Sequence, residues 1–104
     1  MTIEIDRDLL WELSREGATE EYPFEGWIVV RDEVVDTWRW GVNKELILRQ
    51  VDSDPAAGPF YGITYRVETS NENYISSLKE ENNPVVLREW EAFHQVAYRP
   101  KGKS

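Results

Sequence analysis

The feature of this sequence that most constrains its fold is a run of apolar residues at every second position in the middle of the chain. The clearest case is the segment PFYGITYRVET, whose apolar residues of one parity are Tyr61, Ile63, Tyr65 and Val67. Successive side chains of a β-strand point to opposite faces of a sheet, so this alternation predicts a strand with one buried face. Residues 27–40, with a bulge or break at Asp32 and Glu33, and residues 46–51 predict two further strands.

Two short helices are expected beside these strands. Asp6 or a neighbouring residue can cap the first helix, and Gly17 can end it. The buried face of this helix would carry Leu9, Leu10 and Leu13. Ser70 or Asn71 can cap the second helix, which would run through Leu78. The last third of the chain, VVLREWEAFHQVAYRP, is typical of one bent strand or two shorter ones.

These elements predict an α+β fold, with a small antiparallel β-sheet of three to five strands and two short helices. A chain of 104 residues has room for one hydrophobic core, so residues 1–104 are expected to form a single domain. We expect residues 99–104 to be a flexible basic tail. Among the large side chains, Trp27, Trp38 or Trp40 should contribute to the core.

The segment from Trp38 to Trp40 raises the question of core or recognition site. If the hairpin turns through residues 42–44, then Trp40 lies opposite Leu46 and Trp38 opposite Leu48. A connection one residue shorter would instead bring Arg39 opposite Leu46. Burial of the apolar face favours the first register, in which both tryptophans belong to the core. The alternative is an exposed sheet face, on which tryptophan and arginine commonly anchor an interface.

The first register would place three arginines on the opposite face of the sheet. They are Arg39, Arg49 and Arg66, and Tyr61 or Tyr65 would lie nearby. Because guanidinium groups bind carboxylate and phosphate in pairs of hydrogen bonds, this cluster could hold a nucleotide or another small anion. The alternative is a solvated face on which the arginines pair with acidic residues of neighbouring strands.

No pattern of catalytic residues stands out. The chain has no cysteine, a single histidine (His94), and no glycine motif of the kind that cradles phosphate. The segment DSDPAAG lacks the later ligands of a calcium loop. We therefore expect a protein that is not an enzyme and that uses no cofactor or metal.

The formal net charge of −8 favours a protein partner with a basic surface over direct binding of nucleic acid, which needs many lysines and arginines. Acidic residues available for such a contact include Glu20, Glu21 and Glu25. The alternative is that the acidity only keeps the protein in solution. No signal peptide and no apolar segment of about 20 residues is present, so we expect a cytoplasmic protein without a membrane contact.

The order of certain residue pairs resembles that of small accessory proteins of bacteriophages and prophages. The resemblance covers about residues 22–67, and its elements are Phe24-Glu25-Gly26-Trp27, Val35-Asp36, Arg39-Trp40, Glu45-Leu46, Phe60-Tyr61 and Tyr65. It implies a viral accessory role, in which a small acidic domain inhibits or modulates a host or bacterial defence protein by occupying it. Such families have no established active site to carry over.

Overall fold

The computed structural model describes residues 2–70 and 73–90 of the protein. Its elements are β1 (Thr2–Ile5), α1 (Arg7–Glu16), β2 (Trp27–Trp38), β3 (Gly41–Asp54), β4 (Gly58–Ser70), β5 (Asn73–Ser76), the 3-10 turn η1 (Ser77–Glu80) and β6 (Val85–Trp90). The α+β class is confirmed, but the expected three to five strands were too few. The predictions for His94 and for the basic tail at 99–104 concern residues outside the described ranges.

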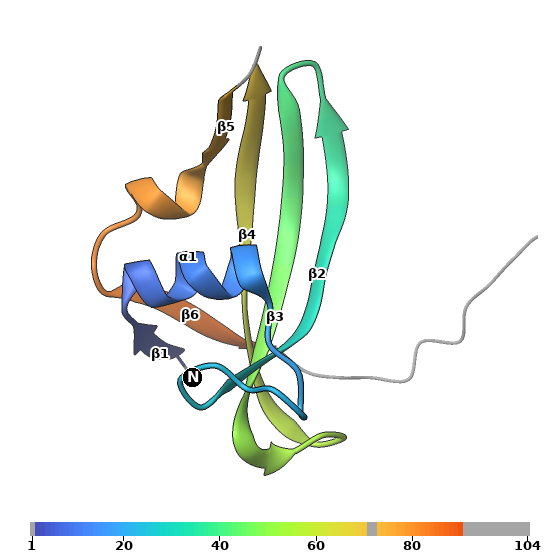
Figure 1. The fold of residues 1–104 in the computed structure, drawn as a ribbon, viewed down its shortest axis with the longest axis vertical. Coiled ribbons are helices and arrows are strands. Elements are labelled where there is room, and N and C mark those ends of the chain that lie inside the picture. Colours follow the sequence, from blue (N-terminus) through green and yellow to red (C-terminus); the bar gives the residue numbers. More distant parts are fainter. Residues whose placement is uncertain (1, 71–72, 91–104) are drawn as a thin grey trace, which may run out of the picture.

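All the strands belong to one antiparallel sheet in the order β1-β6-β4-β3-β2, and β5 pairs with the far end of β4 (Figure 1). The two long hairpins β2–β3 and β3–β4 make its centre. β1 was not predicted from the sequence, and its four residues pair with β6, which lies far along the chain. A strand this short gives a weak local pattern, and only its partner stabilises it.

Helix α1 forms where the sequence places it. The Asp6 carboxylate accepts hydrogen bonds from the backbone N–H groups of Asp8 and Leu9, at 2.8 and 3.4 Å. These bonds satisfy donors that the first helical turn leaves free. Gly17 follows the last turn with a φ of 75°, a conformation that favours glycine, and its N–H donates to the carbonyl of Leu13.

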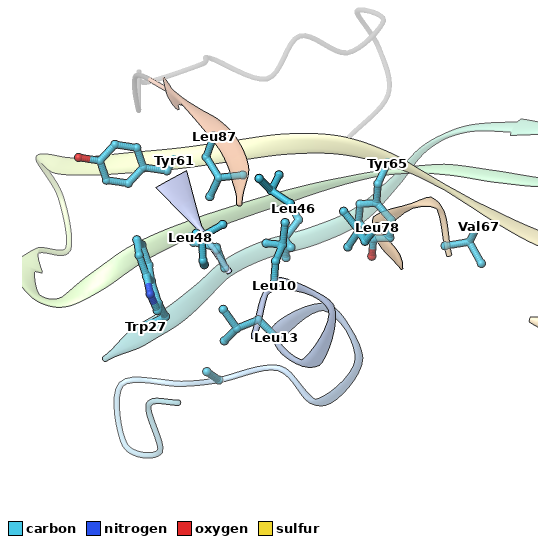
Figure 2. Close-up of a cluster of buried hydrophobic side chains, with 13 residues drawn as sticks. Leu10, Leu13, Trp27, Leu46, Leu48, Tyr61, Tyr65, Val67, Leu78 and Leu87 are labelled. Carbon is cyan, nitrogen blue, oxygen red and sulfur yellow. The ribbon is translucent and has the colours of Figure 1, made fainter. Parts of the chain in front are cut away.

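The hydrophobic core lies between α1 and the face of the sheet that α1 crosses (Figures 1 and 2). Leu10 and Leu13 of the helix and Leu46 and Leu48 of β3 are all fully buried or nearly so. Burying a leucine side chain contributes roughly 1.5–3 kcal/mol, so these four residues supply much of the stabilisation of the fold.

The predicted second helix was wrong. Its expected residues form the end of β4, then β5, and the helical part is only the short η1 turn. The Ser76 hydroxyl caps η1 by accepting from the N–H of Leu78, whose side chain is completely buried. Pairing of β5 with the long β4 strand overrides the local helical pattern, because backbone hydrogen bonds to a partner strand replace those within a helix.

The predicted register of the β2–β3 hairpin was also wrong. Trp38 pairs with Gly41, so the turn consists of Arg39 and Trp40, and Leu46 lies opposite Asp32. Neither turn residue has a positive φ, and the usual sequence signal of a two-residue turn is absent. β2 also has two bulges, at Val30 and Val35, which flank the expected break at Asp32 and Glu33 rather than coincide with it.

A difference in length explains why the tryptophans are not all buried. A helix is about 10–12 Å wide, and α1 crosses the strands, whereas the 14 residues of β3 extend about 46 Å (Figure 1). The distal end of the β2–β3 hairpin therefore lies beyond the cover of α1. Trp27 is buried at the near end, Trp38 is half-buried, and Trp40 at the turn exposes 53% of its surface.

Candidate functional site

Among the charged residues predicted to form a site, Arg49 is the one that is buried. It lies on the sheet face opposite α1 and exposes only 4% of its surface. Its guanidinium donates to the carbonyl oxygens of Gln50 and Ser53, at 3.3 and 3.0 Å, and to the Glu20 carboxylate. All these contacts tie neighbouring segments together, so Arg49 serves the fold rather than a ligand.

Arg66 and Arg39 lie at the other end of the sheet, each against a tryptophan. The Arg66 guanidinium carbon is 4.9 Å from the centre of the Trp38 ring, and that of Arg39 is 4.8 Å from the centre of the Trp40 ring. These are cation–π distances. Arg66 pairs with Asn43 across the strands.

The three arginines therefore do not form one anion site. On β4, Arg66 is six residues from Phe60, the cross-strand partner of Arg49, which corresponds to about 20 Å along the strand. The predicted alternation of β4 is nevertheless confirmed, because Tyr61 and Tyr65 face α1 and the core. Tyr61 packs edge-on against Trp27, with ring centres 6.2 Å apart and an angle of 80° (Figure 2).

The predicted acidic residues lie in the connection between α1 and β2. All three are exposed, and the Glu20 carboxylate is paired with Arg49. This connection enters β2 at Trp27, and the hairpin turn follows the other end of the same strand. Twelve residues of strand put these acids about 40 Å from the turn, so they belong to a separate surface.

Two tryptophans and two arginines gather at the turn of the β2–β3 hairpin, and we call this group the hairpin tip: Trp38, Arg39, Trp40 and Arg66. Gly41 fixes its geometry, because a Cβ atom there would lie 2.1 Å from the carbonyl oxygen of Val67. The indole N–H of Trp38 is buried and has no hydrogen-bond acceptor among the described residues. The tip is thus held close to β4 without being packed as a core.

A second feature is a groove of about 830 Å³ on the α1 side of the sheet, between α1, the distal strands and η1. We call it the α1–η1 groove. The residues that give it its character are Trp11, Arg15, Asp32, Lys44, Tyr65 and Lys79. A volume of this size falls in the range of sites for small organic molecules.

The floor of the groove is a closed polar network. The ammonium group of Lys44 is 3.0 Å from one carboxylate oxygen of Asp32, and the Tyr65 hydroxyl donates to the other at 2.9 Å. The Asp32 and Lys44 side chains are only 18% and 19% exposed. Asp32 lies on the buried face of β2, opposite Leu46. Its contacts with Lys44 and Tyr65 offset the cost of burying a carboxylate there, so this register is stable although the apolar pattern disfavoured it.

The rim of the groove gathers two cations around one aromatic ring. The Arg15 guanidinium carbon lies 4.4 Å from the centre of the Trp11 ring, and the Lys79 ammonium lies 4.0 Å from it. The hydrogen bond from Arg15 to Glu12 raises the pKa of the guanidinium, and Glu16 adds to this. Arg15, like other arginines, is effectively always protonated.

Most of this groove was not predicted from the sequence. Among its residues only Tyr65 was predicted as a site residue. Trp11 and Arg15 are four residues apart on α1, a spacing that places them on one helix face, and this signal was available. Lys79 comes from a turn far away in the sequence, and nothing local indicates that it reaches Trp11. Within residues 2–70 and 73–90, no group of three acidic or histidine side chains is placed to hold a metal ion.

Comparison with known proteins gives no further guide to the site. No protein-family model, no curated protein and no solved structure matches the chain. No helix in the described ranges is long and apolar enough to cross a membrane.

Proposed function

We propose that this is a non-enzymatic binding protein that contacts another protein through the hairpin tip. The observation that carries the proposal is Trp40, which exposes 53% of its surface at the end of a hairpin and is stacked by Arg39. Tryptophan and arginine are the residue types that most often dominate the binding energy of protein interfaces. A large exposed aromatic side chain at this position adds little to the core, and its burial by a partner would be favourable.

The partner that we propose is a bacterial host or defence protein, which the binding would inhibit or modulate in the cytoplasm. The resemblance of residues 22–67 to phage accessory proteins supports this class of partner. The net charge of −8 supports a partner with a basic surface, because charge complementarity speeds the encounter of two proteins. Glu21 and Glu25, at the opposite end from the tip, would serve such steering rather than the close contact.

The free edge of the sheet along β2 supports a partner less well than the tip does. It exposes Val30, Val34 and Val35, which would suit an added strand. Two bulges interrupt this edge, however, and Arg31 and Glu33 on it form an ion pair at 2.9 Å. Bulges and charges are the usual protection of a sheet edge against pairing with another chain.

A capture experiment with matched variants tests the proposal. The immobilised protein is incubated with bacterial lysate, and any captured protein is purified and titrated back by calorimetry. We expect Trp40→Ala to abolish the interaction. Tyr22→Ala removes an aromatic side chain that is 74% exposed in the α1–β2 connection, and it should bind like the original protein. Equal binding by Trp40→Ala and the original protein would exclude the tip as the contact.

The salt dependence of the association and dissociation rates distinguishes a contact through Trp40 from a contact through the acidic residues. Contacts between exposed charges weaken with rising ionic strength, whereas burial of a tryptophan does not. We expect the dissociation rate of the complex to change little between low and high salt, and the association rate to fall. A dissociation rate that rises steeply with salt would assign the main contact to Glu21, Glu25 and their neighbours instead.

A further inference from the structure

The α1–η1 groove lies on the opposite face of the sheet from Trp38 and Arg66, and the proposed protein contact does not use it. The two lie on opposite sides because Val67 of β4 faces the groove, whereas Arg66, its neighbour in the strand, faces away. The groove exists because α1 covers only part of the strands and η1 packs beside the helix (Figure 1). Any ligand there would bind independently of the tip.

The wall of the groove combines apolar surface with a cation that has no acidic partner among the described residues. Trp11 and Ile75 contribute the accessible apolar surface, because Val67 is only 1% exposed. Lys44 is neutralised by Asp32, and Arg15 by Glu12 and Glu16, whereas no carboxylate in the described part of the chain forms an ion pair with Lys79. The Lys79 ammonium contacts the Trp11 ring at the rim. An anionic group entering the groove would meet this ammonium first.

The charges in and beside the groove nearly balance one another. The lining has three cations (Arg15, Lys44 and Lys79) and two carboxylates (Asp32 and Glu80), and Glu12 and Glu16 pair with Arg15, a sum of −1 in a protein of formal charge −8. Glu80 lies beside Lys79 and can accept hydrogen bonds from hydroxyl or amine groups. The site therefore offers complementary contacts to a ligand that carries an anion, an apolar body and hydroxyl donors together.

We propose that the α1–η1 groove binds a small phosphate ester of the nucleotide class. Lys79 meets the phosphate, Trp11 and Ile75 contact the apolar ring, and Glu80 accepts hydrogen bonds from the sugar hydroxyls. The volume of about 830 Å³ is far larger than an inorganic ion needs and is sufficient for a nucleoside monophosphate.

Three probes dissect this proposal by nuclear magnetic resonance on the isotopically labelled full chain: adenosine monophosphate, adenosine and inorganic phosphate. We expect adenosine monophosphate to shift the indole N–H signal of Trp11 and the backbone signals of Val67 and Lys79 in a saturable way. Adenosine and phosphate alone should bind at least tenfold more weakly, because each lacks one of the two recognised parts. Equal binding of either fragment, or no shift at these residues, would overturn the proposal.

Variants then test the assigned contacts. Lys79→Gln should weaken binding of adenosine monophosphate about tenfold or more, because it removes one charge-assisted contact to the phosphate. Arg88→Gln removes an exposed cation from the other face of the sheet and should leave the affinity unchanged. Ile75→Ser should weaken adenosine as well as adenosine monophosphate, because it changes the contact to the ring. An unchanged affinity of Lys79→Gln with a native spectrum would overturn the assignment.

Discussion

Beneath α1, Leu46 and Leu48 of β3 are completely buried, whereas Trp40, immediately before the same strand, exposes 53% of its surface. The two ends of the sheet share strands and hydrogen bonding but differ in cover. Beneath α1 and the turn η1, one face of the sheet is buried, and apolar side chains stabilise the fold. At the turn of the β2–β3 hairpin, no helix within residues 2–70 and 73–90 lies over the strands, and side chains of the same types are left for contact with solvent or a partner. Position relative to α1 therefore decides whether a tryptophan stabilises this protein.

The largest expected effect is at the near end. Trp27→Ala should lower the free energy of unfolding by about 3–5 kcal/mol, because Trp27 is 9% exposed and packs edge-on against Tyr61. Urea unfolding followed by circular dichroism measures this change. Trp27→Phe keeps an aromatic ring and should lose less. If Trp27→Ala were as stable as the original protein, burial beneath α1 would not be what makes a tryptophan stabilise the fold.

A smaller loss is expected when the buried arginine is removed. Arg49→Ala should lower the free energy of unfolding by about 1.5–3 kcal/mol, because the carbonyl oxygens of Gln50 and Ser53 lose a charged donor. The exposed Arg88→Ala is the matched control and should change stability by less than about 0.5 kcal/mol. Equal effects of the two substitutions would indicate that Arg49 is not tied into the fold and is free to act in a site.

The close approach of Gly41 to β4 sets the next prediction. Gly41→Ala should lower the free energy of unfolding by about 1–3 kcal/mol, because the added Cβ atom would lie 2.1 Å from a backbone oxygen and the hairpin must shift. Thr37→Ala, at an exposed position of β2, is the control for a general loss of strand stability. A neutral Gly41→Ala would show that the distal hairpin moves freely relative to β4.

The smallest effect on stability is expected at the turn itself. Trp40→Ala should change the free energy of unfolding by less than about 0.5 kcal/mol, as is usual for surface substitutions. The same denaturation experiment as for Trp27→Ala gives a direct comparison of one residue type at the two ends of the sheet. A loss of several kcal/mol at Trp40 would place it in a core and remove the basis for a binding role.

Local patterns determined the parts of the fold that depend on neighbouring residues. The cap at Asp6 and the stop at Gly17 define α1, because helix ends are satisfied by groups within a few residues. The alternation from Tyr61 to Val67 defines β4 and its buried face, because side chains alternate in any strand. The α+β class follows from these elements alone.

Only the tertiary structure decided how the elements meet. The turn at Arg39 and Trp40 and the pairing of Asp32 with Leu46 depend on bulges, on Gly41 against Val67 and on a lysine that neutralises the aspartate. None of these has a local signature, and a shift of one residue in register reverses the face of every side chain.

The candidate sites divide in the same way. The sequence by itself identified Arg39, Arg66 and the tryptophans as residues of interest, because exposed arginine and aromatic side chains have recognisable chemistry. It could not determine that Arg66 lies about 20 Å along β4 from the residue that pairs with Arg49, or that Lys79 reaches Trp11. Those facts come from the lengths of the strands and from the position of α1, which covers one part of them. The local pattern fixes which face a side chain takes, and the packing of distant segments fixes whether that face is covered.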